Sequence, residues 1–256
     1  MSKKTLNAIF LCFFFVVLAT KTFSQKQKID QTQLWFAYLN NLKFSDKWRL
    51  LTDIQERQFV LPVGAKGNLI FRSILYHNLG SNWEVGAGLA LFFTGPQKVP
   101  STSDLVVPEL RPTVDFLYKQ KAGQLNINHR YRFEARYFHD VANNALDDGF
   151  SFGNYRFRYQ LSLDYPLIKN AQKKPVVSAR VYDEIFLNAG HKIVSNTFDQ
   201  NRTYAGFVFT ASKSFSFELG YLKWFQETSD GKTYFNRDIY RVGINQTINL
   251  SKSKKS

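Results

Sequence analysis

Two neighbouring segments of the chain alternate almost strictly between apolar and polar residues. The first runs from Leu125 to Tyr137 and the second from Asn154 to Tyr165. Successive side chains leave a β-strand on opposite faces, so this alternation predicts two long strands, each with one apolar and one polar face. About twelve residues at roughly 3.3 Å each, tilted by about 45°, span about 28 Å, which is close to the hydrocarbon thickness of a bilayer.

Segments of the same kind recur along the rest of the chain, separated by residues that favour turns. We expect eleven strand segments, over residues 31–42, 47–59, 68–79, 82–94, 107–119, 124–138, 152–165, 176–188, 200–212, 215–226 and 236–250. Short connections alternate with longer ones, which predicts an all-β fold, a transmembrane antiparallel up-and-down β-barrel. Single-chain bacterial barrels have an even number of strands. We therefore expect 10–12 strands, with twelve favoured over ten.

The first 24 residues have the features of a cleaved signal peptide. Lys3 and Lys4 provide a basic start, residues 8–20 form an apolar run, and a short exit ends at Ser24. An apolar run of about thirteen residues is too short for a spanning helix, which needs about twenty. We expect residues 1–24 to be removed and residues 25–256 to form a single barrel domain in the bacterial outer membrane. The one cysteine, Cys12, lies in the predicted signal, so disulfides have no part in the expected mature fold.

Arginine and lysine occupy different parts of the chain, whose formal net charge is +14. All thirteen arginines fall in or beside predicted strands, whereas most lysines lie in predicted connections. A planar guanidinium pairs with carboxylates at low hydration cost, so arginine suits an enclosed interior. We expect a polar network, structural or pore-lining, at Arg130, Arg132, Glu134, Arg136, Arg156, Arg158, Arg180, Glu184, Arg202 and Glu218. Further acidic partners are expected at Asp53, Glu56, Glu109, Asp115 and Asp164. This placement and the export signal together argue against a nucleic-acid partner.

Several strings of the sequence resemble a known family. They are WRLLTDIQERQF (48–59), LNINHRYRFEARYF (125–138), NYRFRYQLSLDYPL (154–167), YDEIFLN (182–188), FDQNRTYAGFVF (198–209) and FELGYLKWF (217–225). In their order and alternation these strings are similar to domain of unknown function 2490, a family of predicted outer-membrane β-barrel proteins of Bacteroidetes-type bacteria. The resemblance covers nearly all of the expected mature chain. It implies a fold and a location, and it carries no established activity.

Candidates for catalysis or metal binding are sparse. His191, Ser195 and Asn196 supply the residue types that a barrel phospholipase uses, although their spacing does not match that class. Asp147 and Asp148 precede a glycine, a pattern that suits a tight turn better than a calcium site. Glu134 and Glu184 are interpreted as charge partners of arginine rather than as an acid and a base. The four scattered histidines have no metal-ligand spacing, and His129 is interpreted as an interfacial aromatic residue. We expect no catalytic residue, metal or cofactor.

The function that these features favour is that of an outer-membrane β-barrel protein, either structural or a narrow channel that prefers anions. The expected surroundings are outer-membrane lipid and lipopolysaccharide, reached through the barrel-insertion machinery, with the protein as a monomer. The sequence does not identify a solute. Two alternatives stay open: an outer-membrane lipid-modifying enzyme, and a soluble periplasmic β-sandwich that binds a polymer.

Overall fold

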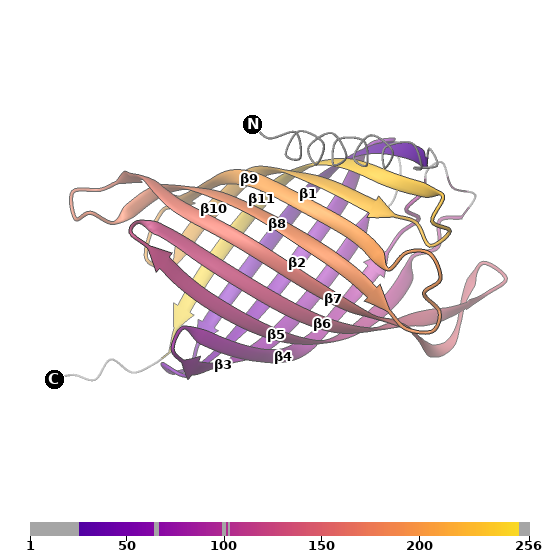
Figure 1. The fold of residues 1–256 in the computed structure, drawn as a ribbon, viewed down its shortest axis with the longest axis horizontal. Helices are drawn as coiled ribbons and strands as arrows, with labels where there is room; N and C mark the ends of the chain where they lie inside the picture. Colours follow the sequence, from indigo (N-terminus) through magenta and orange to yellow (C-terminus); the bar gives the residue numbers. More distant parts are fainter. Residues whose placement is uncertain (1–25, 64–66, 99–100, 102, 251–256) are drawn as a thin grey trace, which may run out of the picture.

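The chain forms one β-sheet that closes on itself as a barrel (Figure 1). The computed structural model describes residues 26–63, 67–98, 101 and 103–250. Its strands are β1 (Gln27–Lys43), β2 (Trp48–Leu61), β3 (Asn68–Gly80), β4 (Trp83–Thr94), β5 (Val107–Ala122), β6 (Leu125–Ala142), β7 (Ala145–Lys169), β8 (Pro175–Ala189), β9 (Phe198–Thr210), β10 (Phe215–Glu227) and β11 (Thr233–Asn249). The predicted all-β barrel is confirmed, and a two-sheet sandwich is not formed. No helix among the described residues has the length and apolar character needed to cross a bilayer. The predicted signal peptide, 1–24, lies outside the described residues.

The expected even number of strands is wrong for the described chain, which has eleven. Each strand matches one of the segments predicted from alternation, with most bounds shifted by a few residues. Ten neighbouring pairs are antiparallel, whereas β1 and β11 pair in parallel from Gln27 opposite Thr233 to Lys43 opposite Asn249. An up-and-down sheet with an odd number of strands closes only if its first and last strands run in the same direction. The alternation of residues identifies each strand separately, but it does not predict which two strands pair to close the barrel.

The two ends of the barrel differ. One end, which we call the short-turn end, has connections of five residues or fewer. They are 44–47, 81–82, 123–124, 170–174 and 211–214. Residues 62–67, 95–106, 190–197 and 228–232 connect strands at the opposite, long-loop end. Strand β1 therefore begins at the long-loop end, and β11 finishes at the short-turn end.

Strands β6 and β7 extend beyond the rim as a long hairpin, which projects from the long-loop end in Figure 1. The sequence pattern predicted a loop over residues 140–151, and this prediction is wrong. Asn143 and Asn144 have φ angles of 50° and 57°. Asparagine tolerates this left-handed conformation, so the pair makes a two-residue turn of the type that matches strand twist. The expected turn residues Asp147 and Asp148 consequently lie in β7, where both are exposed.

The outer face of the barrel carries exposed apolar side chains along most strands, among them Phe71, Val114, Phe133, Val181 and Phe207. Near the short-turn end, aromatic rings stack from strand to strand, through the pairs Trp48 with His77, Trp83 with Tyr118, Tyr118 with His129, and His129 with Tyr159. Nδ1 of His129 lies 2.9 Å from the Tyr159 hydroxyl. Such a row of aromatic side chains is typical of the interface between a membrane and water.

Two tyrosines lie against the inner wall because glycine leaves room for them. A Cβ on Gly220 would lie 2.3 Å from the hydroxyl oxygen of Tyr204, and a Cβ on Gly86 would lie 2.5 Å from the ring of Tyr76. Tyr204 stacks on Tyr182 with ring centroids 4.7 Å apart. The lumen is thus narrowed by side chains packed along its wall.

Candidate lumen site

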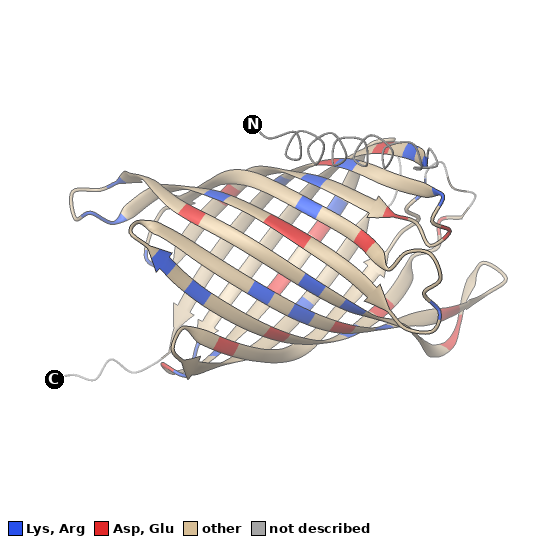
Figure 2. Cartoon of the chain, viewed as in Figure 1, with Lys and Arg blue, Asp and Glu red and all other residues tan. Residues whose placement is uncertain are grey.

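All thirteen arginines of the sequence occupy lumen-facing positions of their strands. They alternate with outward residues, as Arg130 and Arg132 do on either side of Tyr131. Figure 2 shows basic and acidic positions distributed across the middle of the strands as well as near their ends. Arg132 and Arg237 are completely buried. Each guanidinium inside this enclosed space needs acceptors, because an unpaired charge is costly in surroundings that exclude water.

A buried two-pronged ion pair in this network joins β5 to β6. Arg132 donates from Nε and from one terminal nitrogen to the two oxygens of Asp115, at 2.6 and 2.7 Å. The hydroxyl of Tyr76 donates to the same carboxylate at 2.5 Å. Two parallel bonds between a guanidinium and a carboxylate combine charge with fixed geometry. This pair therefore holds three strands, β3, β5 and β6, in a defined arrangement.

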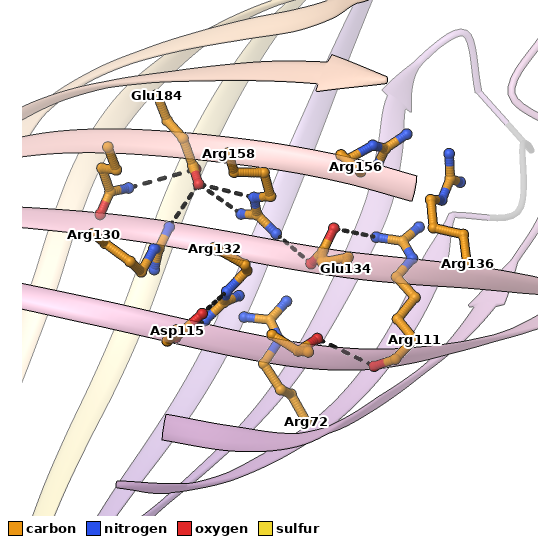
Figure 3. A network of polar contacts seen from close by, with 12 residues as sticks. Arg72, Arg111, Asp115, Arg130, Arg132, Glu134, Arg136, Arg156, Arg158 and Glu184 are labelled. Atoms are coloured by element: carbon orange, nitrogen blue, oxygen red, sulfur yellow. Dashed lines mark hydrogen bonds and ion pairs between the residues drawn. The ribbon is translucent and has the colours of Figure 1, made fainter. Parts of the chain in front are cut away.

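Arg158 lies at the centre of a second group, shown in Figure 3. Its two terminal nitrogens lie 2.8 Å from an oxygen of Glu134 and 2.8 Å from an oxygen of Glu184. Arg130 donates to the same oxygen of Glu184 at 2.7 Å. The structure thus brings four of the predicted network residues together from three adjacent strands, β6, β7 and β8.

The remaining predicted residues form smaller groups around the wall. Glu109 accepts from Arg111 and from Arg136, at 2.6 and 2.5 Å. Arg180 bridges Asp164 and Glu218, at 2.5 and 2.7 Å. Glu218 also accepts a hydrogen bond from Arg241.

Two acidic residues are placed differently from the sequence expectation. Glu56 was expected as a partner of a lumen arginine, but it is exposed and accepts a hydrogen bond from Gln58 at 2.6 Å. The expectation is wrong because the alternation of β2 places Glu56 on the outer face of the barrel. Asp199 was not expected, yet it lies 2.9 Å from Arg156. A register shift in the β8–β9 pair places two successive buried residues, Asp199 and Gln200, at the start of β9, and alternation alone cannot find such a bulge.

Arg202 has a different environment from the other predicted arginines. Among the described residues it has no hydrogen-bond or ion-pair partner, and its Nε is buried without an acceptor. Its guanidinium carbon lies 4.7 Å from the ring centroid of Phe186, 4.4 Å from that of Trp224 and 5.4 Å from that of Trp35. Aromatic faces attract a cation but leave the in-plane N–H donors free.

Arg57 and Arg237 likewise have no carboxylate partner among the described residues, and neither was among the network residues predicted from the sequence. Arg57 stacks 3.8 Å over Trp35 and donates to Gln55 at 2.9 Å. Arg237 donates to Gln31 and Gln226, each at 2.6 Å. Arg57 lies four residues after Asp53 in β2 and therefore on the same face of the strand. This spacing would have placed Arg57 in the lumen from the sequence alone.

Two of the cavities in the lumen lie one above the other along the barrel. The long-loop chamber, of about 280 Å³, is bounded at its rim by Gly95, Pro96, Gln97, Leu105 and Val107. The short-turn chamber, of about 270 Å³, is bounded by residues toward the other end, including Leu39, Asn128, Ser162 and Asn245. Among the described residues, four line both chambers, and all four are arginines: Arg57, Arg72, Arg158 and Arg202. We call these four the arginine constriction.

The residues that were candidates for lipid hydrolysis are not arranged as a catalytic site in the described part of the chain. His191 and Ser195 are both exposed in the connection between β8 and β9, and no hydrogen bond joins them. Asp147 accepts a hydrogen bond from the backbone N–H of Asp148 at 2.9 Å. In the described residues, no group of three or more His, Cys, Asp or Glu side chains is arranged to hold a metal ion.

Comparisons with known proteins identify a family and similar folds. Two solved structures resemble the chain weakly. The NanC porin is 11% identical, with a TM-score of 0.49 and coverage of 84% of this chain and 99% of that one. The outer membrane channel DcaP of Acinetobacter baumannii is 10% identical, with a TM-score of 0.37 and coverage of 77% and 58%. No curated protein matches the sequence. A family model described as a protein of unknown function matches residues 32–235, and the chain therefore belongs to the DUF2490 family.

Proposed function

We propose that this protein is an outer-membrane β-barrel with a narrow lumen that prefers small anions. The single observation that carries the proposal is the arginine constriction, since the described residues that line both chambers are all arginines. Rings of basic side chains are a common source of anion preference in pores. We infer that Arg57 and Arg202 contribute most, because neither is paired with a carboxylate.

The charges around the long-loop chamber support this preference. Seven arginines line it, namely Arg57, Arg72, Arg111, Arg136, Arg156, Arg158 and Arg202, against a single carboxylate, Glu109. Charges of one sign in a cleft with walls of low dielectric constant concentrate the field and raise the local concentration of ions of opposite sign. The proposed preference thus arises from an excess of cations over anions within the barrel.

The outer face supports a location in the outer membrane. Apolar side chains cover the middle of the strands, and the aromatic row lies near the short-turn end, as in outer-membrane barrels. In such barrels the short turns face the periplasm and the long loops face outward. We therefore propose that the long-loop chamber opens to the cell exterior, that the protein is a monomer surrounded by lipid and lipopolysaccharide, and that it is not an enzyme.

Conductance of the purified protein in planar bilayers tests the proposal. Under a potassium chloride gradient we expect a small conductance whose reversal potential has the sign of chloride preference. Arg202→Glu should reduce or invert that preference. The control is Arg49→Gln, since Arg49 pairs with Glu84 near the short-turn end and lines neither chamber. A wide pore, a cation-selective pore, or a selectivity that Arg202→Glu leaves unchanged would contradict the proposal.

A further inference from the structure

We propose that the long-loop chamber is a saturable binding site for a small organic oxyanion, a compound bearing carboxylate or phosphate groups. This inference rests on the proposed function in one respect, because the chamber is part of the same lumen. It adds a defined site with its own donors, distinct from a general preference for negative ions during passage.

Several buried hydrogen-bond donors without a protein acceptor line the chamber. Nε of Arg57, Nε of Arg72, Nε of Arg202 and Nε1 of Trp224 are all buried without an acceptor from the protein. Arg202 is only 9% exposed and Trp224 only 4%. Among the described residues, the same lining holds one unpartnered acceptor, Oε1 of Gln200. A buried donor without an acceptor is costly, so the surplus of donors around this cavity favours a ligand rich in oxygen acceptors.

Aromatic rings fix the orientation of two arginines that line the chamber and have no carboxylate partner among the described residues. Arg57 lies 3.8 Å over the ring of Trp35, and Arg202 lies 4.4 Å over that of Trp224. A guanidinium stacked on a ring has one face covered, while its N–H groups point along its plane. These groups match the planar oxygens of a carboxylate or the oxygens of a phosphate, to which arginine donates two parallel bonds.

The size of the chamber and the fixed position of its rim also suit a small ligand. A volume of about 280 Å³ is equivalent to on the order of ten water molecules at about 30 Å³ each, which suits a compound of comparable heavy-atom number. The rim at Gln97 is held in place from three sides, since its backbone oxygen accepts from Gln31, its amide donates to Asn68, and its amide oxygen accepts from Arg237. The ligand therefore enters a preformed site.

Tryptophan fluorescence of the folded protein in detergent tests the site without requiring conduction. Trp35 and Trp224 adjoin Arg202, whereas Trp48 and Trp83 lie on the outer face. Titrations with citrate and with pyrophosphate, at constant ionic strength, separate carboxylate from phosphate ligands, and glucose serves as the neutral control. We expect saturable quenching by at least one of the two anions and none by glucose.

Substitution shows whether the signal comes from this site. Arg202→Gln should weaken binding at least tenfold, and Arg49→Gln should leave it unchanged. Trp224→Phe should remove most of the quenching, while calorimetry of the same variant should detect binding that is weakened by the loss of one donor, Nε1 of Trp224. Absence of saturable binding by both anions, or equal binding by Arg202→Gln, would overturn the inference. If chloride selectivity persists in that case, the proposed function stands alone; saturable binding without selectivity would instead refute the channel and retain the site.

Discussion

Glu184 and Arg202 face each other across strands β8 and β9, yet they form no ion pair. The carboxylate of Glu184 instead accepts hydrogen bonds from Arg130 at 2.7 Å and from Arg158 at 2.9 Å. Arg202 is left with aromatic neighbours, at the boundary between the two chambers. Because the Glu184 carboxylate pairs with two arginines on one side of the lumen, the third arginine, Arg202, is left without a carboxylate and is available to a solute.

This division predicts different effects on stability for two arginines. Arg132→Gln should lower the free energy of unfolding by about 3–5 kcal/mol, because it leaves the buried Asp115 carboxylate without its cation. Arg202→Gln breaks no ion pair and should cost only about 0.5–2 kcal/mol of cation–π attraction. Urea unfolding in lipid vesicles, followed by gel mobility, measures both. Equal losses would show that Arg202 is paired in the membrane.

The parallel closure of the barrel predicts a specific cross-link. Phe36 and Val242 are direct partners on the outer face of β1 and β11. The double variant Phe36→Cys, Val242→Cys should form a disulfide upon oxidation, because the Cα atoms of paired residues lie within the range of about 4.4–6.8 Å that a disulfide spans. Phe36→Cys with Ile248→Cys is the control, since Ile248 pairs with Leu42. Failure of the first pair to cross-link would indicate another strand between β1 and β11.

The stability cost of a charged substitution on the outer face should depend on how deep the residue lies in the membrane. Phe133 is exposed near the middle of β6, and Phe133→Arg should cost about 2–4 kcal/mol in lipid vesicles. Tyr165 is also exposed but lies near the short-turn end of β7. Tyr165→Arg should cost only about 0–1 kcal/mol, as expected close to the interface. The fraction of folded protein after refolding from urea reports both values, and a larger cost at Tyr165 would refute the proposed position of the membrane.

Orientation can be tested on intact cells, since the sequence has no cysteine after Cys12. Asn143→Cys places a thiol at the tip of the β6–β7 hairpin, and Ser45→Cys places one in the turn between β1 and β2. A membrane-impermeant maleimide should label only Asn143→Cys in intact cells and both variants after lysis. Labelling restricted to Ser45→Cys before lysis would mean that the barrel is inserted in the opposite direction.

The strands and their two faces were predictable from residue order, because a strand places alternate side chains on opposite sides whatever its neighbours are. The same rule assigned Arg130, Arg132 and Arg136 to a polar face opposite Tyr131 and Phe133. The β6–β7 hairpin was missed because its Asn143–Asn144 turn signal lies within a run that also contains Asp147, Asp148 and Gly149, which were interpreted as turn residues.

Only the folded barrel shows how the sheet closes and which side chains pair within the lumen. Residue order does not state which strand lies beside β1, and the odd count follows from its parallel pairing with β11. Nor does alternation tell which of several nearby arginines Glu184 will contact, since the register between strands and the bulge at Asp199 fix those distances. Arginine was therefore identifiable as an interior residue from local pattern, whereas the uncompensated charge of Arg202 arises from contacts between segments far apart in the chain.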